Sequence, residues 1–161
     1  MSNLLKEAIS NRWNDADSAT MSEPELLLYR SNLLGSDLRI TNYGGGNTSA
    51  KIRLRDPPTD APVDVLWVKG SGGDIGSMKL DGFATLYLDK LHALKQRYHG
   101  LQREDEMVDL FPHCTWNLNP RATSIDTPPH CFIPYPHVDH MHADAIIAIA
   151  AARNGERRRW R

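Results

Sequence analysis

DLRITNYGGGNTSAKIRL (residues 37–54) and VDVLWVKGSGGDIGSM (residues 63–78) each join short β-prone runs through a glycine-rich turn. Runs of β-prone residues bounded by glycine turns are typical of neighbouring antiparallel strands. The two stretches together therefore predict three strands of an antiparallel sheet.

Helical spacing occurs on both sides of these stretches in the sequence. Ser22 and Glu25 match a capping box ahead of an apolar face, which predicts a helix over residues 23–34 that ends at Gly35. The apolar spacing over residues 79–96 predicts a second helix, which should cover one face of the sheet. The expected fold class is α+β.

The C-terminal half is less regular. Six prolines between residues 100 and 136 predict a loop-rich segment with one short helix at most. A short strand over residues 138–142 and a buried, alanine- and isoleucine-rich helix over residues 144–153 are expected next. The closing basic tail RNGERRRWR fits neither pattern, and Gly155 is expected to stop the helix.

Composition excludes several classes of protein. The 19 Lys and Arg residues balance 20 Asp and Glu residues, so no basic surface for nucleic acid or an anionic membrane is expected. No apolar stretch approaches the ~20 residues that span a bilayer, and the N-terminus lacks the apolar region of a signal peptide. With 161 residues, 40% of them hydrophobic, one domain over residues 1–161 in the cytoplasm is expected.

Two cysteines, Cys114 and Cys131, lack any CxxC pairing. They therefore indicate neither a disulfide framework nor a standard zinc module. Both are expected to be reduced, buried thiols.

The two glycine turns are candidate anion sites. Three glycines precede Asn47, and Ser71 and Gly72 follow Lys69 in the second turn. Glycines allow backbone conformations that expose N–H groups to an oxyanion, and the polar side chains add donors. The first turn matches neither the Walker pattern nor the complete dinucleotide fingerprint, so a mobile hairpin turn stays open. Two such turns in adjacent hairpins favour one shared phosphate.

ATSIDTPPH (residues 122–130) holds the next candidate. Asp126 lies among Ser124, Thr127 and His130. It could be a positioned general base, or an aspartate that caps a turn before the prolines.

HVDHMHADA (residues 137–145) holds a candidate metal site. Alternate residues of a strand project from one face, so His140 and His142 could share one metal ion, while His137 would point elsewhere. Neutral imidazole is a good zinc ligand, but catalytic zinc normally takes three protein ligands. A chance HxH pattern therefore stays open.

Taken in chain order, the glycine turns, ATSIDTPPH and HVDHMHADA resemble the class II aldolase/adducin family. The resemblance is strongest to the aldolase half of bifunctional rhamnulose-1-phosphate aldolase/short-chain dehydrogenase proteins. The resemblance covers roughly residues 23–156. It implies a three-layer α/β/α domain with a central, mostly antiparallel sheet, truncated here at its C-terminal end. It also implies a homo-oligomer, a tetramer in related aldolases.

The resemblance assigns the phosphate-binding residues one by one. The family's two glycine turns bind the substrate phosphate, which implies Asn47, Ser71 and Gly72, and its third loop adds Ser124. This sequence departs from the pattern at Ile125, which replaces a second serine and so removes one hydroxyl donor.

The remaining assignments concern catalysis. The resemblance implies that Asp126 is the acid/base residue and that His140 and His142 are the first two ligands of Zn²⁺. The family's third zinc histidine lies tens of residues farther along, and nothing before Arg161 can be assigned to it. We therefore expect the chain to be a fragment that is short of one zinc ligand.

The implied reaction is reversible cleavage of a phosphorylated ketose, of the rhamnulose-1-phosphate type, to dihydroxyacetone phosphate and an aldehyde. Zinc would act as the Lewis acid. Two alternatives stay open. A pentulose-phosphate 4-epimerase shares the zinc site and has Asp in the third loop, and an adducin-like domain would serve assembly without catalysis.

Overall fold

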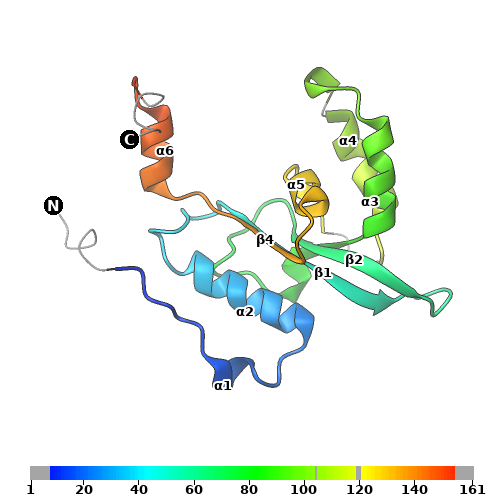
Figure 1. The fold of residues 1–161 in the computed structure, drawn as a ribbon, viewed down its shortest axis with the longest axis horizontal. Helices are drawn as coiled ribbons and strands as arrows, with labels where there is room; N and C mark the ends of the chain where they lie inside the picture. The colour runs from blue at the N-terminus through cyan, green and yellow to red at the C-terminus, as the bar shows by residue number, and fades with distance from the viewer. Residues whose placement is uncertain (1–7, 104, 119–120, 155–161) are drawn as a thin grey trace.

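The computed structural model describes residues 8–103, 105–118 and 121–154, and these build a sheet with helices on both faces (Figure 1). Neighbouring strands pair antiparallel in the order β3-β2-β1-β4. The strands are β1 (Asn47–Arg55), β2 (Pro62–Lys69), β3 (Phe83–Tyr87) and β4 (His137–His140).

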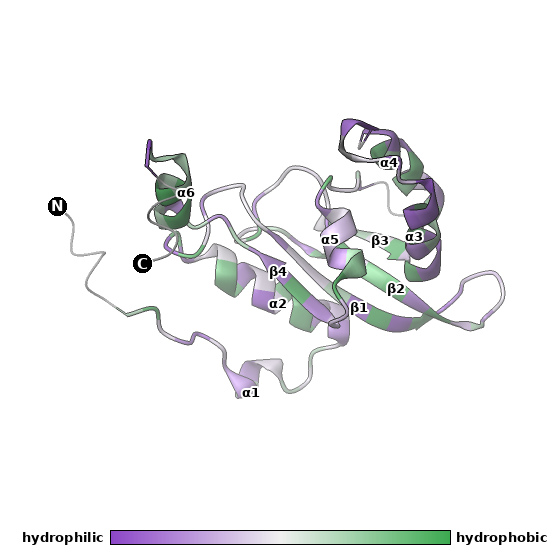
Figure 2. Ribbon diagram, turned by 45° about the horizontal axis from the view of Figure 1, so that its top comes forward, coloured by the Kyte–Doolittle hydropathy of each residue, from purple (hydrophilic) through white to green (hydrophobic). Residues whose placement is uncertain are grey.

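Helices lie on both sides of this sheet, while α1 and α6 stand away from it (Figure 1). In the described chain the α-helices are α1 (Asp15–Ser18), α2 (Glu23–Gly35), α3 (Leu88–Leu94), α4 (Asp105–Leu110), α5 (Thr127–Phe132) and α6 (Asp144–Ala151). Short 3₁₀ turns add η2 (Leu80–Gly82), η3 (Lys95–Arg97), η4 (Leu101–Arg103) and η5 (Phe111–Cys114). Helix α2 lies on one face, and α3, α4 and α5 lie on the other (Figures 1 and 2). The predicted three-layer α/β/α fold is confirmed.

Strand alternation divides the core between the two layers. In β2, Leu66 and Val68 face α3 and α5, while the intervening Trp67 packs toward α2. The core against α2 comprises Leu27, Ala50, Ile52 and Phe83. The core against α3 to α5 comprises Leu66, Val68, Ala84, Leu86, Leu91, Met107, Phe111, Cys114 and Cys131. Both faces of the sheet are therefore covered, as buried two-sided strands require.

Helix α2 begins and ends at the predicted residues. The backbone N–H and hydroxyl of Ser22 both donate to the Glu25 carboxylate, at 2.8 and 2.6 Å, so the capping box is confirmed. Gly35 ends the helix where the chain comes close to Gly76: a Cβ on Gly35 would lie 2.2 Å from the Gly76 nitrogen. Only glycine permits this approach, which brings the second glycine loop against α2.

One strand prediction and one helix prediction are wrong. Residues 37–41 form a turn, closed by an Ile40 N–H bond to the Asp37 carbonyl at 2.9 Å. The third strand is instead β3, inside the stretch predicted as one helix over residues 79–96. Pairing with β2 buries β3 on both faces, and this long-range gain outweighs the helical spacing of its apolar residues.

The C-terminal half also differs from expectation. Residues 100–136 contain two short α-helices, α4 and α5, rather than one at most. Helix α6 was expected to be buried, but Ile146, Ile147 and Ile149 are 65%, 43% and 39% exposed, and none of its residues is buried. The tail from residue 155 lies outside the described residues. No helix in the described part of the chain has the length and apolar character to cross a membrane.

The cysteine prediction is confirmed. Cys114 and Cys131 are both free thiols and both buried. Burial raises the pKa of the Cys131 thiol to about 11, so it stays protonated and packs as a small apolar side chain.

Strand β4 pairs with β1 in a register that matters for the site. Asn47 is opposite His140, and Thr48 is opposite Asp139. In an antiparallel pair, directly opposed residues project from the same face. The register therefore places the asparagine of the first glycine loop beside a histidine of the HxH pair.

Polar contacts from α2 hold this register. The Arg30 guanidinium donates to the Ser49 carbonyl at 2.8 Å and pairs with the Asp139 carboxylate at 3.1 Å. One residue along, the Ser31 hydroxyl bonds the Thr48 hydroxyl at 2.7 Å. Helix α2 thus bridges β1 and β4 from the face opposite the predicted metal ligands.

We expect Arg30→Met to lower the free energy of unfolding by about 1–3 kcal/mol, because it leaves Asp139, whose side chain is 33% exposed, without its partner. Arg53→Met is the matched control: Arg53 pairs with Asp64 at 2.8 Å, but both side chains are more than half exposed, so its effect should stay below about 0.5 kcal/mol. Urea unfolding measures both. Equal effects of the two substitutions would show that the α2 bridge does not hold the strands.

Candidate functional site

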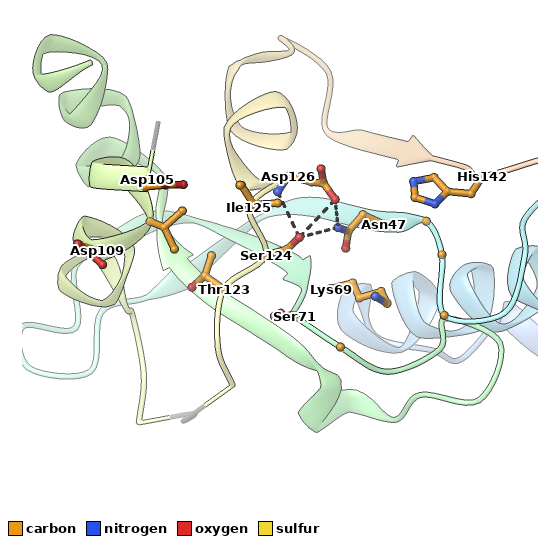
Figure 3. A pocket seen from close by; sticks show the side chains of 16 residues that line it. Asn47, Lys69, Ser71, Asp105, Asp109, Thr123, Ser124, Ile125, Asp126 and His142 are labelled. Carbon is orange, nitrogen blue, oxygen red and sulfur yellow. Dashed lines mark hydrogen bonds between the residues drawn. The ribbon is translucent and has the colours of Figure 1, made fainter. Parts of the chain in front are cut away.

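A cavity of about 560 Å³ opens where three loops meet (Figure 3). The loops precede β1, follow β2 and precede α5, so segments far apart in sequence contribute to one site. Six of the seven predicted site residues line it: Asn47, Ser71, Gly72, Ser124, Asp126 and His142. The seventh, His140, lies beside the cavity and is described below.

The glycine loops use conformations that favour glycine. Gly44 and Gly46 in the first loop have φ of 75° and 79°, and Gly72 and Gly73 in the second have φ of 71° and 79°. The first loop is not a hairpin turn, because it follows a turn rather than a strand. The Gly44 N–H donates to the carboxylate of Asp74 in the second loop at 3.1 Å. The two loops are therefore linked, and sequence reasoning did not identify Asp74 as the link.

Asn47, Ser124 and Asp126 form a hydrogen-bond network at the cavity wall (Figure 3). The Asn47 side-chain N–H₂ donates to the Ser124 hydroxyl and the Asp126 carboxylate, both at 2.9 Å. The Ser124 hydroxyl also accepts the Asp126 backbone N–H at 3.2 Å. The side-chain carbonyl oxygen of Asn47 is buried and has no hydrogen-bond partner within the described residues. A buried oxygen without a partner is available to accept a hydrogen bond from a ligand.

The position of Asp126 decides between its two interpretations. It is the residue before α5, yet its side chain makes no capping hydrogen bond to that helix in the described structure. Its carboxylate instead bonds Asn47 across the cavity wall. Asp126 is therefore a positioned acidic group rather than a turn cap.

Lys69 supplies positive charge at the cavity. It ends β2, lines the cavity and is only 5% exposed. Burial lowers the pKa of its ammonium group, while the nearby carboxylates of Asp126 and Asp74 raise it. The sequence shows Lys69 beside the second glycine loop, but burial at the end of a strand is what marks it as a site residue.

His140 and His142 converge as predicted. Their ring centroids are 4.8 Å apart, and His140 Nδ1 lies 3.9 Å from Asp126 Oδ2. Strand β4 ends at His140, but the His142 carbonyl accepts the Asn42 N–H at 3.0 Å and keeps the chain extended. A Cβ on Gly45 would lie 2.8 Å from His142 Nδ1, so the glycine makes room for this ring.

The histidine pair fits zinc in the kind of donor it offers. Two imidazoles and a nearby carboxylate are typical zinc-site groups. Within residues 8–103, 105–118 and 121–154, however, no group of three or more His, Cys, Asp or Glu side chains could hold a metal ion. The described residues thus offer fewer clustered protein donors than the three that catalytic zinc usually takes.

His130 lies buried close to the site. It is fully buried on α5, and its Nδ1 lies 2.7 Å from the Ser49 hydroxyl of β1. Burial lowers its pKa to about 4, so the ring is neutral at pH 7. Sequence reasoning noted His130 only as a neighbour of Asp126, because burial cannot be seen in a proline-rich stretch.

The structure is similar to the N-terminal class II aldolase domain of a conserved protein from Thermoplasma acidophilum. The TM-score is 0.78 at 34% sequence identity, over 91% of this chain and 66% of that chain. The chain has the fold of a class II aldolase domain. No protein-family model matches the sequence.

A longer relative shares the same region. This class II aldolase-like chain is 42% identical over 149 residues to the uncharacterized oxidoreductase YuxG of Bacillus subtilis. The match takes in 92% of this chain but only 21% of that protein. The chain thus spans about a fifth of the length of the curated relative it matches.

We expect the buried His130 to make stability depend on acid. Its pKa is about 4 in the folded state against an ordinary 6.5, so the unfolded chain binds more protons between these values. The stabilisation is complete above pH 6.5 and is lost as the pH falls toward 4. His130→Gln should remove on the order of 2 kcal/mol of the loss in unfolding free energy between pH 7.5 and 4.5. The exposed His113→Gln should keep the wild-type loss, and an unchanged loss in His130→Gln would refute the buried neutral ring.

Proposed function

We propose that the chain is a lyase domain that binds a phosphorylated ketose, of the rhamnulose-1-phosphate type. The reaction is reversible cleavage to dihydroxyacetone phosphate and an aldehyde. The class II aldolase fold supports lyase-type chemistry. The observation that carries the proposal is the network of Asn47, Ser124 and Asp126, which joins the phosphate-type loops to an acid/base group in one cavity.

The two glycine loops would bind the phosphate. Their positive-φ glycines can turn backbone N–H groups toward an oxyanion. The hydroxyls of Ser71 and Ser124 add donors from the cavity wall, and Asn47 would hold Ser124 in place through its side-chain N–H. The ammonium group of Lys69 adds positive charge from a buried position, where a charge pair is screened little by water. Holding the phosphate would fix the reacting carbons within the cavity.

Asp126 would move the proton at the carbon next to the ketose carbonyl. Asn47 holds its carboxylate at 2.9 Å, and the carboxylate faces the cavity beside His140. A general base must lie within hydrogen-bond reach of the proton it takes. A fixed carboxylate between the phosphate loops and the histidines meets this need for a substrate anchored by its phosphate.

His140 and His142 would hold zinc, together with a ligand that the described residues do not include. A zinc ion bound there supplies Lewis acidity to the carbonyl and hydroxyl oxygens of the ketose. The chain's own contribution is to fix both rings. Thr41 and Asn42 bind the backbone of His142, and the β1–β4 register fixes His140.

The long relative suggests where such a domain works. YuxG carries an oxidoreductase name, and the shared region is 21% of its length. We propose that the shared region is its aldolase-type part and that oxidoreduction belongs to the remainder.

A pentulose-phosphate 4-epimerase is the second candidate function for this chain, favoured by the aspartate, Asp126, in the third loop.

Phosphate binding tests the anion site apart from catalysis. Asn47→Ala should weaken binding of inorganic phosphate by about tenfold, because it releases the Ser124 hydroxyl and leaves the Asp126 carboxylate without its donor beside the anion. Asn14→Ala, at the start of the distant α1, should leave the affinity unchanged. Isothermal titration calorimetry measures both. A wild-type chain that does not bind phosphate would contradict the anion site.

Cleavage tests the reaction. Asp126→Asn should lower the zinc-dependent release of dihydroxyacetone phosphate from rhamnulose 1-phosphate by about 10²–10⁴-fold, with phosphate affinity nearly unchanged. Asp109→Asn, at the far end of the cavity, should change the rate far less. Interconversion of pentulose phosphates without cleavage would favour the epimerase. Neither activity in the zinc-loaded chain would favour a non-catalytic assembly domain.

A further inference from the structure

Strand β1 presents a row of polar side chains to α5. Asn47, Ser49 and Lys51 are alternate residues of the strand, so they project from one face of the sheet. The intervening Thr48 and Ala50 face α2 on the other side. Of the three polar residues only Asn47 lines the cavity, so the site described above does not account for the other two.

The first two of these side chains bond groups that lie one helical turn apart. Asn47 donates to the Asp126 carboxylate at 2.9 Å, directly before α5. The Ser49 hydroxyl lies 2.7 Å from His130 Nδ1, within α5. Two residues along a strand span about 6.7 Å, and four residues along a helix span about 6 Å. Because these spans nearly match, the two bonds form side by side, and α5 cannot shift along β1 by a turn without losing both.

Lys51 adds a third attachment beyond the end of α5. Its ammonium group donates to the backbone carbonyls of Ile133 and Tyr135, the second at 2.9 Å. The segment is therefore attached to β1 before, within and after the helix. These attachments matter because α5 has only six residues, and so short a helix is not stable by itself.

The bond between Ser49 and His130 is the most buried of these attachments. Ser49 is 1% exposed and His130 is fully buried, whereas the side chain of Asp126 is 39% exposed. Breaking a buried hydrogen bond leaves a polar group that water cannot reach, which is costlier than breaking an exposed one. The Ser49–His130 bond therefore sets the position of α5, while Asp126 at the start of the helix faces the cavity.

We propose that Ser49 and His130 are positioning residues for the acid/base carboxylate of Asp126. The proposal rests on the proposed function, which gives Asp126 a proton to move. Neither Ser49 nor His130 lines the cavity, so they act through α5 and not by contact with a ligand. Their bond fixes α5 above β1 and so keeps Asp126 Oδ2 at 3.9 Å from His140 Nδ1. A misplacement of about 1 Å in such a site can cost up to about 10²-fold in rate.

Two substitutions of His130 separate the bond from the bulk of the ring. His130→Gln puts its amide near the position of Nε2, out of reach of Ser49, whereas His130→Asn puts its amide near Nδ1 and keeps the bond. In the zinc-loaded chain, His130→Gln and Ser49→Ala should each lower kcat for rhamnulose 1-phosphate cleavage about tenfold, with KM nearly unchanged. His130→Asn should restore most of the rate. The double variant Ser49→Ala/His130→Gln should lose no more than either single variant, because both remove the same bond.

The side-chain N–H₂ of Asn47 reports the position of α5 without zinc or substrate. It donates to Ser124 and Asp126, both at 2.9 Å, so a loosened α5 should speed the exchange of its protons with water. Heteronuclear NMR should show exchange about tenfold faster in Ser49→Ala and His130→Gln than in the wild type. His130→Asn should stay near the wild-type rate.

Thr85→Val is the matched control. It removes a hydroxyl bond of 2.6 Å to Asn117 from a residue that is only 2% exposed. Thr85 belongs to β3, which is separated from β1 by β2. The variant should keep the wild-type kcat and the wild-type exchange rate of Asn47. Thermal unfolding confirms that every variant is folded at the assay temperature.

The possible failures are distinguishable. Wild-type exchange of Asn47 in both Ser49→Ala and His130→Gln would overturn the positioning role, and so would faster exchange without a loss of kcat. Equal losses in Thr85→Val would overturn it as well, because they would reflect general stability. A wild-type chain that cleaves no ketose phosphate would overturn the proposed function. In that case faster exchange in the two variants would still support the placement of Asp126 by α5, and unchanged exchange would overturn it.

Discussion

The pairing of β4 with β1 is the constraint on which the candidate site depends. It puts Asn47, the last residue of the first glycine loop, opposite His140. A slip of one residue would turn every β4 side chain to the other face of the sheet, and the histidine would then face α2. The contacts of Arg30 with Ser49 and Asp139 oppose such a slip. The geometry of the site therefore depends on how α2 packs against β1 and β4.

Around this pairing the site combines two kinds of environment. On one side are linked glycine loops, a buried lysine and a network that holds Asp126, which suit an anion and a proton transfer. On the other is an apolar cavity that begins at Ile125. Asp126 lines both cavities and so lies where the two environments meet.

Much of this arrangement could be predicted from local sequence. The capping box and the HxH spacing are short patterns that formed as expected, whereas the first glycine loop follows a turn and not the expected strand. Strand β3 was missed because its apolar residues also fit helical spacing, and only its pairing with β2 reveals it. Lys69 and His130 were not assigned because burial depends on distant segments. The apolar cavity is lined by residues between 95 and 111 and between 125 and 132, which meet only in the fold, so no local pattern indicates it.

We propose that a phosphate site and a pair of metal-binding histidines meet at one cavity, which His142 lines and His140 adjoins. A crystal structure grown with zinc and dihydroxyacetone phosphate, with anomalous data at the zinc edge, would locate both ligands. We expect an anomalous peak within bonding distance of His140 and His142, about 2.1 Å from each ring nitrogen, and a phosphate group on the loops of Asn47, Ser71 and Ser124. Zinc bound away from this pair, or a phosphate bound away from these loops, would refute this arrangement.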